Sequence, residues 1–299
     1  MGLTAIVLGA AAGGGFPQWN CNCDVCRLAW AGDPRVRART QASLAVSSDR
    51  QRWTLLNASP DLRAQLQATP ALHPRGLRES PIQAVVLTGG EIDQTAGLLS
   101  LRERSAFTLT ATAATLAAVS DNPMFGVLAR DVVSRRAVTP GETFSLGDGL
   151  QAELFMVPGK LPLYLEGDNP DPAEESAANV GVEITDGLKR LAYVPGAAAV
   201  TASLRSRLSR ADAILFDGTL YTDDEMIRTG TGQKHGRRMG HMPIDGDGGT
   251  LAALAGLPAR KIFVHINNTN PILVDSSPER RKVEAAGWEV AEDGMEIVL

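Results

Sequence analysis

Residues 82–99 read "IQAVVLTGGEIDQTAGLL", and this stretch indicates the class of fold. Its apolar first half, 82–88, is typical of a strand buried on both faces in the middle of a sheet. The strand runs into a glycine turn that carries Glu91 and Asp93, and we expect a helix over 93–104 directly after it. Carboxylates at the C-terminal end of a central strand are well placed for chemistry. Alternatively, Asp93 only caps the helix, whose N-terminal dipole favours an acidic side chain.

Strands and short helices alternate in the same way along the whole chain of 299 residues. Three hairpins are expected, at 41–59, 142–159 and 180–196, together with further strands at 3–10, 212–220, 259–268 and 294–299. Helices are expected at 199–211, 248–258 and 277–287, and the acidic segment 166–179 is predicted to be a solvated loop or else a lid. Two halves that each begin with hairpins and continue with strand–helix units predict an α/β protein. We expect a four-layer αββα sandwich formed as a single domain over 1–299.

The composition excludes several classes of partner. Charged residues make up 21% of the chain and hydrophobic ones 44%, as in ordinary soluble globular proteins, and the formal net charge is -5. A protein that binds phosphates is usually basic, so no nucleic-acid partner is expected. No apolar run reaches the roughly 18 residues that span a bilayer. The glycine-rich N-terminus suits a strand and turn better than a signal peptide, and we predict a cytoplasmic protein without a membrane span.

The only three cysteines of the chain lie within six residues, in the segment "CNCDVC" at 21–26. Three thiolates from Cys21, Cys23 and Cys26 in one short loop could hold a tetrahedral zinc ion, with a fourth ligand from elsewhere. The alternative is three reduced cysteines that are merely packed. Three anionic sulfur ligands would lower the Lewis acidity of zinc, which favours a structural role over a catalytic one.

A second group of polar residues follows other apolar strands. Asp217 in "ILFDGTLY" and His265 in "IFVHINNTNP" each end such a strand, where a polar group must be paired or functional. His241 lies in the glycine-rich loop between these two strands. A lone histidine at a strand end is commonly a satisfied structural residue. Together, however, Asp93, Asp217, His241 and His265 would make a mixed nitrogen and oxygen site for iron, manganese or zinc.

These pieces, in this order, resemble the metallo-β-lactamase superfamily, and within it the coenzyme PQQ (pyrroloquinoline quinone) synthesis protein B family. The resemblance covers essentially the whole chain and implies the αββα sandwich with a metal site at the edges of the sheets. The segments that carry it are "LGAAAGGGFPQWNCNCDVCRLAW" (8–30), "LLNASPDLRAQL" (55–66), "EID" (91–93), "VPGK" (157–160), "LFDGTLY" (215–221), "MGHMPI" (239–244) and "IFVHINNTNP" (262–271).

The chain departs from the superfamily signature H-x-H-x-D-H, which corresponds to 89–94 here. Both leading histidines are absent, and Gly159 lies where another ligand histidine is often found. The resemblance therefore implies that one of two metal positions has lost its ligands, which argues against two-metal hydrolysis. Asp93 and His265 would hold a metal at the other position, with Asp217 bridging or nearby. Relatives usually carry a histidine after the aspartate, where this chain has Gln94. An amide oxygen is a weaker ligand than imidazole, so the metal affinity should be lower unless His241 takes the place of the missing histidine.

The function implied by the resemblance is a step of PQQ biosynthesis. The expected reaction is iron-dependent hydroxylation of the tyrosine ring in a cross-linked Glu–Tyr precursor. Fe²⁺ would be held by Asp93 and His265, with Asp217 orienting a ligand and His241 acting as acid/base or substrate contact. A dipeptide-like precursor and other proteins of the PQQ pathway are the expected partners. The alternatives are a carrier that takes PQQ or its precursor out of the cytoplasm, and a hydrolase with an altered site.

The resemblance also implies a structural Zn²⁺ at the cysteine loop. Relatives complete this site with a histidine from just beyond the last ligand strand, and Asn268 takes that place here. The fourth ligand could therefore be Asn268, a water molecule or an aspartate.

Overall fold

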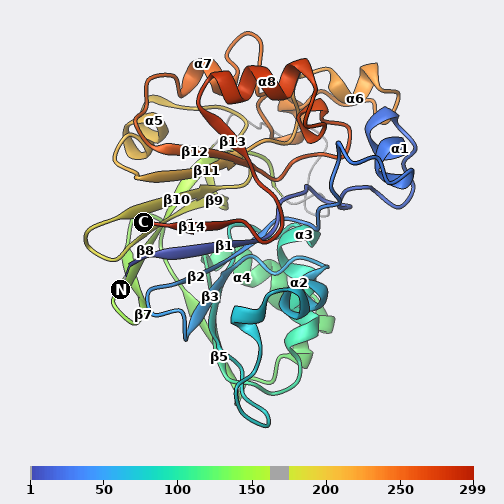
Figure 1. Ribbon diagram of the computed structural model, residues 1–299. Helices are drawn as coiled ribbons and strands as arrows, with labels where there is room; N and C mark the ends of the chain where they lie inside the picture. Colours follow the sequence, from blue (N-terminus) through green and yellow to red (C-terminus); the bar gives the residue numbers. More distant parts are fainter. Residues whose placement is uncertain (1, 162–174) are drawn as a thin grey trace.

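The structure is a computed structural model that describes residues 2–161 and 175–299. Within these ranges, the strands form two seven-stranded mixed sheets that stack face to face, and helices cover both outer faces (Figure 1). This arrangement confirms the predicted α/β class and the four-layer αββα sandwich.

The first sheet has the strand order β14-β1-β2-β3-β4-β5-β6. The pairs β14–β1, β1–β2 and β2–β3 are antiparallel. The pairs β3–β4, β4–β5 and β5–β6 are parallel. Their bounds are β1 Thr4–Gly9, β2 Ser43–Ser47, β3 Trp53–Leu56, β4 Ile82–Val86, β5 Phe107–Ala111, β6 Val133–Ala137 and β14 Glu296–Val298.

The second sheet has the order β13-β12-β11-β10-β9-β8-β7. Strands β10 to β13 are parallel, and β7, β8 and β9 continue the sheet in antiparallel pairs. Their bounds are β7 Thr143–Gly147, β8 Leu150–Pro158, β9 Glu175–Thr185, β10 Arg190–Val194, β11 Ala213–Asp217, β12 Arg260–Val264 and β13 Trp288–Val290.

Helices α2, α3 and α4 lie on the side of the first sheet, and α5, α7 and α8 on the side of the second (Figure 1). No helix in the described ranges is long and apolar enough to cross a membrane. The bounds of the α-helices are α1 Asp24–Trp30, α2 Leu62–Ala68, α3 Ile92–Thr95, α4 Ala113–Ser120, α5 Ala202–Leu208, α6 Glu225–Arg228, α7 Thr250–Ala253 and α8 Pro278–Ala285. Short 3₁₀ turns are η1 Pro70–Leu72, η2 Ala96–Leu101, η3 Pro123–Val127, η5 Arg237–Met239 and η6 Pro271–Leu273.

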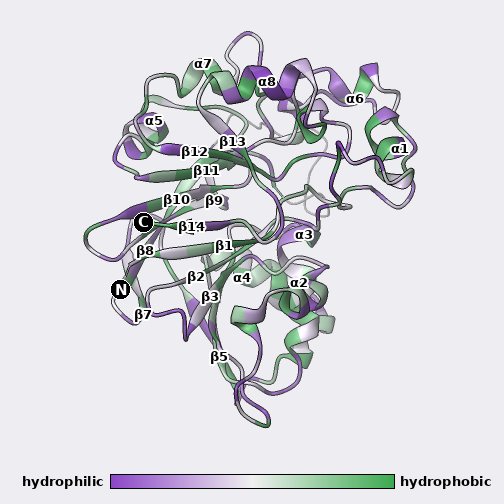
Figure 2. Ribbon diagram, viewed as in Figure 1, coloured by the Kyte–Doolittle hydropathy of each residue, from purple (hydrophilic) through white to green (hydrophobic). Residues whose placement is uncertain are grey.

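Three apolar layers hold the four structural layers together. The middle layer lies between the sheets and includes Leu44, Val86, Leu154, Leu215 and Val264. The outer layers pack the helices onto the sheets, with Trp53 and Leu98 in one and Phe216 and Trp288 in the other. Figure 2 shows strand β1 largely white to green and the outer helix α8 largely purple, as expected when each helix buries only one face.

Most predicted elements are confirmed, including the three hairpins, which form as β2–β3, β7–β8 and β9–β10. The helix expected over 93–104 is wrong, because α3 ends at Thr95 and a 3₁₀ segment follows. At Gly97 the chain presses against the neighbouring backbone: a Cβ there would lie 2.1 Å from the carbonyl oxygen of Ser59, and Gly97 N donates to Ala58 O instead. The helix expected at 248–258 is likewise reduced to the single turn of α7.

The acidic segment 166–179 was expected to be a loop, and its last five residues are instead the start of β9. Val157 and Pro158 pair with Ser176 and Glu175, so this part of the segment belongs to the β8–β9 pair. The remainder of the expected loop, 166–174, lies outside the described residues.

The topology brings the polar strand ends to one edge of the sandwich. Asp217 is the last residue of β11, His265 follows the last residue of β12, and Asp93 lies in α3 just after β4. Because the C-terminal ends of parallel strands meet at the same edge, side chains far apart in the sequence become neighbours there.

Candidate active site

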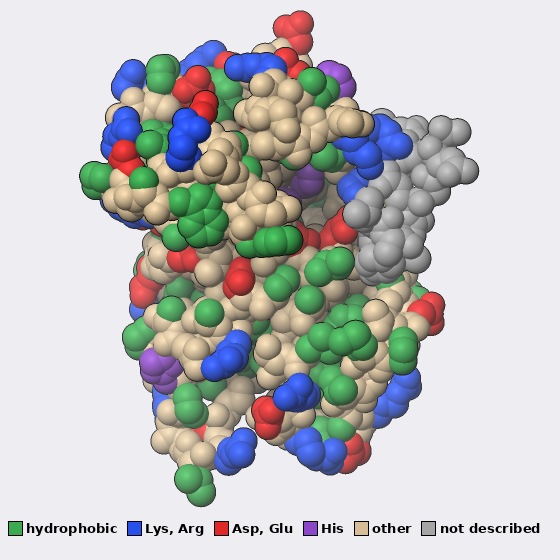
Figure 3. All heavy atoms as spheres, turned by 90° about the vertical axis from the view of Figure 1, so that its right-hand side faces the viewer, with side chains coloured by type: hydrophobic (Ala, Val, Ile, Leu, Met, Phe, Trp, Pro, Cys, Tyr) green, Lys and Arg blue, Asp and Glu red, His purple; other side chains and the backbone are tan. Residues whose placement is uncertain are grey.

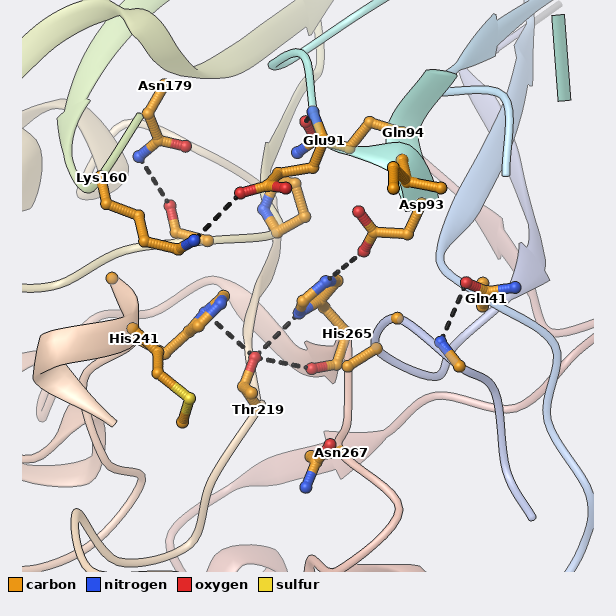
Figure 4. Close-up of a pocket in the computed structure, with 18 of the residues that line it drawn as sticks. Gln41, Glu91, Asp93, Gln94, Lys160, Asn179, Thr219, His241, His265 and Asn267 are labelled. Carbon is orange, nitrogen blue, oxygen red and sulfur yellow. Dashed lines mark hydrogen bonds and ion pairs between the residues drawn. The ribbon is translucent and has the colours of Figure 1, made fainter. Parts of the chain in front are cut away.

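The four residues predicted to form a site, Asp93, Asp217, His241 and His265, come together at this edge of the sandwich. Asp93, His241 and His265 line a cavity of about 530 Å³, and Asp217 is fully buried directly behind it. Figure 3 shows the cavity as a hollow between the upper and lower parts of the molecule, with histidine and acidic side chains inside it. The close-up in Figure 4 shows both imidazoles on one wall and Asp93 facing them.

His265 has a backbone φ of 54°, in the left-handed region that few non-glycine residues adopt. Contacts on both sides accompany this conformation: Thr219 Oγ1 lies 2.9 Å from His265 O, and Ile266 N donates to Ala10 O. Strained backbone of this kind clusters at functional sites, where the surrounding structure imposes it. From this position, directly after β12, the residue lines the cavity.

Asp93 and His265 form a close pair, with 2.9 Å between Asp93 Oδ2 and His265 Nε2 (Figure 4). Burial by itself lowers the pKa of His265, but the hydrogen bond and charge of Asp93 outweigh burial and raise it. Burial likewise works to raise the pKa of Asp93, and the hydrogen bond and charge of His265 bring it below its ordinary value. Both residues are thus held in their charged forms when no cation lies between them.

Asp217 and His241 form a second pair, with 2.7 Å between Asp217 Oδ2 and His241 Nδ1. The carboxylate also accepts hydrogen bonds from Ala197 N, Thr219 N and Thr219 Oγ1. Burial tends to raise the pKa of Asp217, but the charge and hydrogen bond of His241 lower it. A buried carboxylate that holds Nδ1 of a histidine leaves Nε2 free to exchange protons, as in acid/base pairs.

Thr219 joins the two pairs and was not singled out in the sequence. Its hydroxyl oxygen lies 2.6 Å from Asp217 Oδ1, 2.8 Å from His265 Nδ1 and 3.1 Å from His241 Nδ1. Side chains two residues apart in extended chain point to the same side. The spacing of Asp217 and Thr219 in "FDGT" was therefore the sequence signal that could have identified Thr219 as a residue of the site.

Gly89 and Gly159, where the resemblance places the lost ligand histidines, adjoin amide side chains. A Cβ at Gly89 would lie 2.5 Å from Gln94 Oε1, and one at Gly159 would lie 2.1 Å from Asn179 Nδ2. Next to these positions Lys160 Nζ contacts Glu91 Oε1 at 3.2 Å. An ammonium group and two amide side chains thus occupy the region where the resemblance places the lost histidines.

Gln94, which stands where relatives usually carry a ligand histidine, has a structural role here. Its Oε1 accepts a hydrogen bond from Glu91 N at 3.1 Å, and together with Glu91 it forms a capping box at the start of α3. The alternative in which Asp93 caps this helix is therefore wrong, because Glu91 is the capping residue. Asp93 is left available for the pair with His265.

Cys21, Cys23 and Cys26 present their sulfur atoms within 4.8 Å of one another, and all three are free thiols. They were expected in a loop, but Cys23 caps α1 and Cys26 lies in its first turn. Asn268 reaches this cluster: its carbonyl oxygen lies 3.7 Å from Cys23 Sγ, and its Nδ2 lies 3.3 Å from Cys26 Sγ. Asn268 as the fourth ligand stays a prediction. Its backbone carbonyl oxygen or its side-chain amide oxygen would be the atom that binds the metal.

The donor atoms of both clusters suit metal ions. Burial raises the pKa of Cys23 to about 12 and also raises the pKa of Cys26, so a nearby cation would favour their thiolate forms. Zinc is the usual ion for three cysteine ligands. Asp93 and His265 offer an oxygen and a nitrogen 2.9 Å apart. Ligand atoms at bond lengths of about 2.1 Å that meet at a right angle lie about 3 Å apart, so one ion fits against both. His241 and Asp217 lie beside this position, and their atoms fall within 4.8 Å of those of His265.

Comparison with known proteins gives a family for this arrangement. A family model described as "Beta-lactamase superfamily domain" matches residues 52–266. Coenzyme PQQ synthesis protein B of Methylobacterium nodulans is 59% identical over 299 residues, which cover 99% of this chain and 100% of the relative. The protein of the same name from Methylorubrum extorquens AM1 is 56% identical over 296 residues, or 98% and 99% of the two chains.

Solved structures agree with this family. The crystal structure of Zn²⁺-bound PqqB from Methylobacterium extorquens superposes with a TM-score of 0.97 at 56% identity, covering 99% of this chain and 100% of that one. A diphosphatase of the PhnP family, 20% identical, superposes with a TM-score of 0.72 over 100% and 98% of the two chains. At that identity the second likeness concerns the fold alone.

Proposed function

The chain belongs to the coenzyme PQQ synthesis protein B family of the metallo-β-lactamase superfamily, and from this membership we propose that it is an oxidoreductase of PQQ biosynthesis. The proposed reaction is iron-dependent hydroxylation of the tyrosine ring in a cross-linked Glu–Tyr precursor. The observation that carries it is the close pair of Asp93 and His265 at 2.9 Å, beside Gly89 and Gly159, which offer no ligands and adjoin the amide groups of Gln94 and Asn179. The missing ligand histidines argue against two-metal hydrolysis.

The residues that would hold the iron are Asp93 and His265, with His241 as the neighbouring imidazole. Imidazole and carboxylate with open positions are the ligand types of non-haem iron oxygenases, although this site has one histidine fewer than their usual triad. When bound, Fe²⁺ supplies the one-electron chemistry that activation of O₂ requires. The cysteine cluster is proposed to hold a structural Zn²⁺, which would tie α1 to the segment that follows His265.

The protein's own groups would bind the precursor and move its protons. Lys160 and Lys234 line the cavity and are suited to the carboxylates of a dipeptide-like precursor. The Asp217–His241 pair lies at the cavity wall and would take up and return the phenol proton. Its Nδ1 is held by Asp217, so Nε2 is the nitrogen that would face the substrate.

The test is O₂ consumption by the Fe²⁺-loaded protein with a cross-linked Glu–Tyr substrate. Hydroxylation of a ring C–H by O₂ takes up two electrons and two protons and releases water, so ascorbate is included as reductant. We expect O₂ uptake with a product 16 mass units heavier, about 10²-fold slower in His241→Gln and abolished in Asp93→Asn. Tight binding of finished PQQ without any turnover would instead identify a carrier.

A further inference from the structure

The hydroxyl of Thr219 has more polar neighbours than it has protons to give. Its oxygen lies 2.6 Å from Asp217 Oδ1, 2.8 Å from His265 Nδ1, 2.9 Å from His265 O and 3.1 Å from His241 Nδ1. The residue is only 5% exposed, so its hydroxyl is largely shielded from water. A hydroxyl carries one donor and two acceptor positions, and its partners decide where its proton points.

The proton of Thr219 goes to Asp217, because an ionised carboxylate is the strongest acceptor in reach and gives the shortest contact. The lone pairs of the hydroxyl then face the ring nitrogen of His265. An imidazole that gives Nε2 to a metal keeps its only proton on Nδ1 and needs an acceptor for it. Thr219 Oγ1 is that acceptor in this chain.

The same oxygen also blocks an alternative metal position. Asp217, His241 and His265 offer ligand atoms within 4.8 Å of one another, which would by itself make a candidate site. Thr219 Oγ1, however, lies within 3.1 Å of Asp217 Oδ1 and of Nδ1 of both histidines. A cation among these three atoms would have to displace the hydroxyl.

We propose that Thr219 is the positioning residue of the metal site: its hydroxyl accepts the Nδ1 proton of His265, presents His265 Nε2 beside Asp93, and closes the inner position among Asp217, His241 and His265 Nδ1. This inference rests on the metal site of the proposed function and is independent of the reaction carried out there. Thr219 Oγ1 accepts a proton from His265 Nδ1 and donates its own proton to Asp217 Oδ1. Each of these two hydrogen bonds therefore has one proton.

The test compares Thr219→Val, which keeps the shape and removes the hydroxyl, with Thr219→Ser, which keeps the hydroxyl. Zn²⁺ and Fe²⁺ affinities of the full chain are measured by competition with a chelator. Metal binding at the active site is identified as the binding event that His265→Asn abolishes. We expect Thr219→Val to bind 10- to 100-fold more weakly and Thr219→Ser to stay within about threefold of the wild type. Metal at the cysteine cluster is the internal control for folding.

A spectroscopic readout separates this role from simple packing. In the Zn²⁺-loaded protein, NMR should show a slowly exchanging, downfield Nδ1 proton of His265, assigned by its loss in His265→Asn. The signal should persist in Thr219→Ser and disappear in Thr219→Val. If Thr219→Val does not fold, Thr219→Ala carries the same comparison, because it removes the hydroxyl without adding bulk.

Wild-type affinity in Thr219→Val, or equal losses in Thr219→Ser and Thr219→Val, would overturn the proposal. Failure of O₂ consumption while the metal affinities and the Nδ1 signal follow the expected pattern would refute the hydroxylase function and leave the role of Thr219 standing. The two failures are therefore distinguishable in the same set of variants.

Discussion

His265 combines a strained backbone with the central imidazole of the site. Asparagine tolerates a positive φ better than most residues, whereas alanine at φ 54° bears a penalty of about 1–2 kcal/mol. We therefore expect metal-free His265→Asn to be more stable than His265→Ala by about 1 kcal/mol, although both lose the active-site metal. Urea unfolding of the two metal-free variants measures this, and equal midpoints and slopes would contradict it.

Gln94 supports the start of α3 where a ligand histidine would otherwise stand. Gln94→His should increase the Fe²⁺ affinity of the site by about tenfold or more, because imidazole is a better ligand than an amide oxygen. It should also lower the free energy of unfolding by about 0.5–1 kcal/mol through loss of the cap. Gln94→Ala is the control, since it loses the cap and gains no ligand. Chelator competition gives the affinity, and no gain in the histidine variant would show that the imidazole cannot reach the metal.

Glu225 is a buried carboxyl outside the site, with hydrogen bonds from Thr269 Oγ1 and Tyr221 N. Burial raises its pKa from 4.5 to about 7. The folded protein therefore holds a proton that the unfolded chain releases, so this group stabilises the fold below about pH 4.5 and its contribution is lost as the pH rises to about 7. The loss amounts to roughly 3 kcal/mol.

Glu225→Gln should remove this dependence, because an amide does not titrate. We expect the free energy of unfolding of the variant, relative to the wild type, to rise between pH 5 and pH 8. Urea unfolding at the two pH values measures the difference, in which the contributions of all other groups cancel. A difference that does not change with pH would mean that Glu225 is already ionised in the folded protein.

At the scale of elements, α1 is a seven-residue helix whose capping residue is itself a cysteine of the cluster. A helix this short has little stability of its own, so the packing around Cys26 and the proposed structural Zn²⁺ would hold it. Removing the metal with a chelator should speed hydrogen exchange in residues 20–31 and 267–270 and leave β1 and β11 unchanged. Cys26→Ser should give the same pattern without chelator, while an unchanged α1 would exclude a structural metal there.

Hydrophobic periodicity predicted the strands and hairpins well, because each buried strand carries its own apolar pattern. Helix lengths were predicted poorly. The segment after Asp93 has good helix formers, yet α3 stops at Thr95, where Gly97 N donates to Ala58 O instead of to the carbonyl four residues back. That constraint comes from a partner segment nearly forty residues away, and no local pattern contains it.

At the scale of the whole molecule, the apolar layer between the sheets joins strands from both halves of the chain. We expect one cooperative unfolding transition, as for the single domain predicted from the sequence. Leu215→Ala, in this layer and 0% exposed, should lower the free energy of unfolding by about 2–5 kcal/mol and shift the whole transition. Leu188→Ala, 89% exposed, is the matched control and should change little. Two separate calorimetric transitions would contradict a single domain.

The sequence by itself determined the two sheets, the hairpins and the identity of the four polar residues at the strand ends, because periodicity and strand-end position are local properties. It also determined the family, through motifs that resemble those of its members. Only the tertiary structure decided how these residues are used. The role of Thr219, the capping by Gln94 and the approach of amide groups to Gly89 and Gly159 each depend on distances between segments that fold together from different parts of the chain. Such distances are set by packing, which no single stretch of sequence specifies.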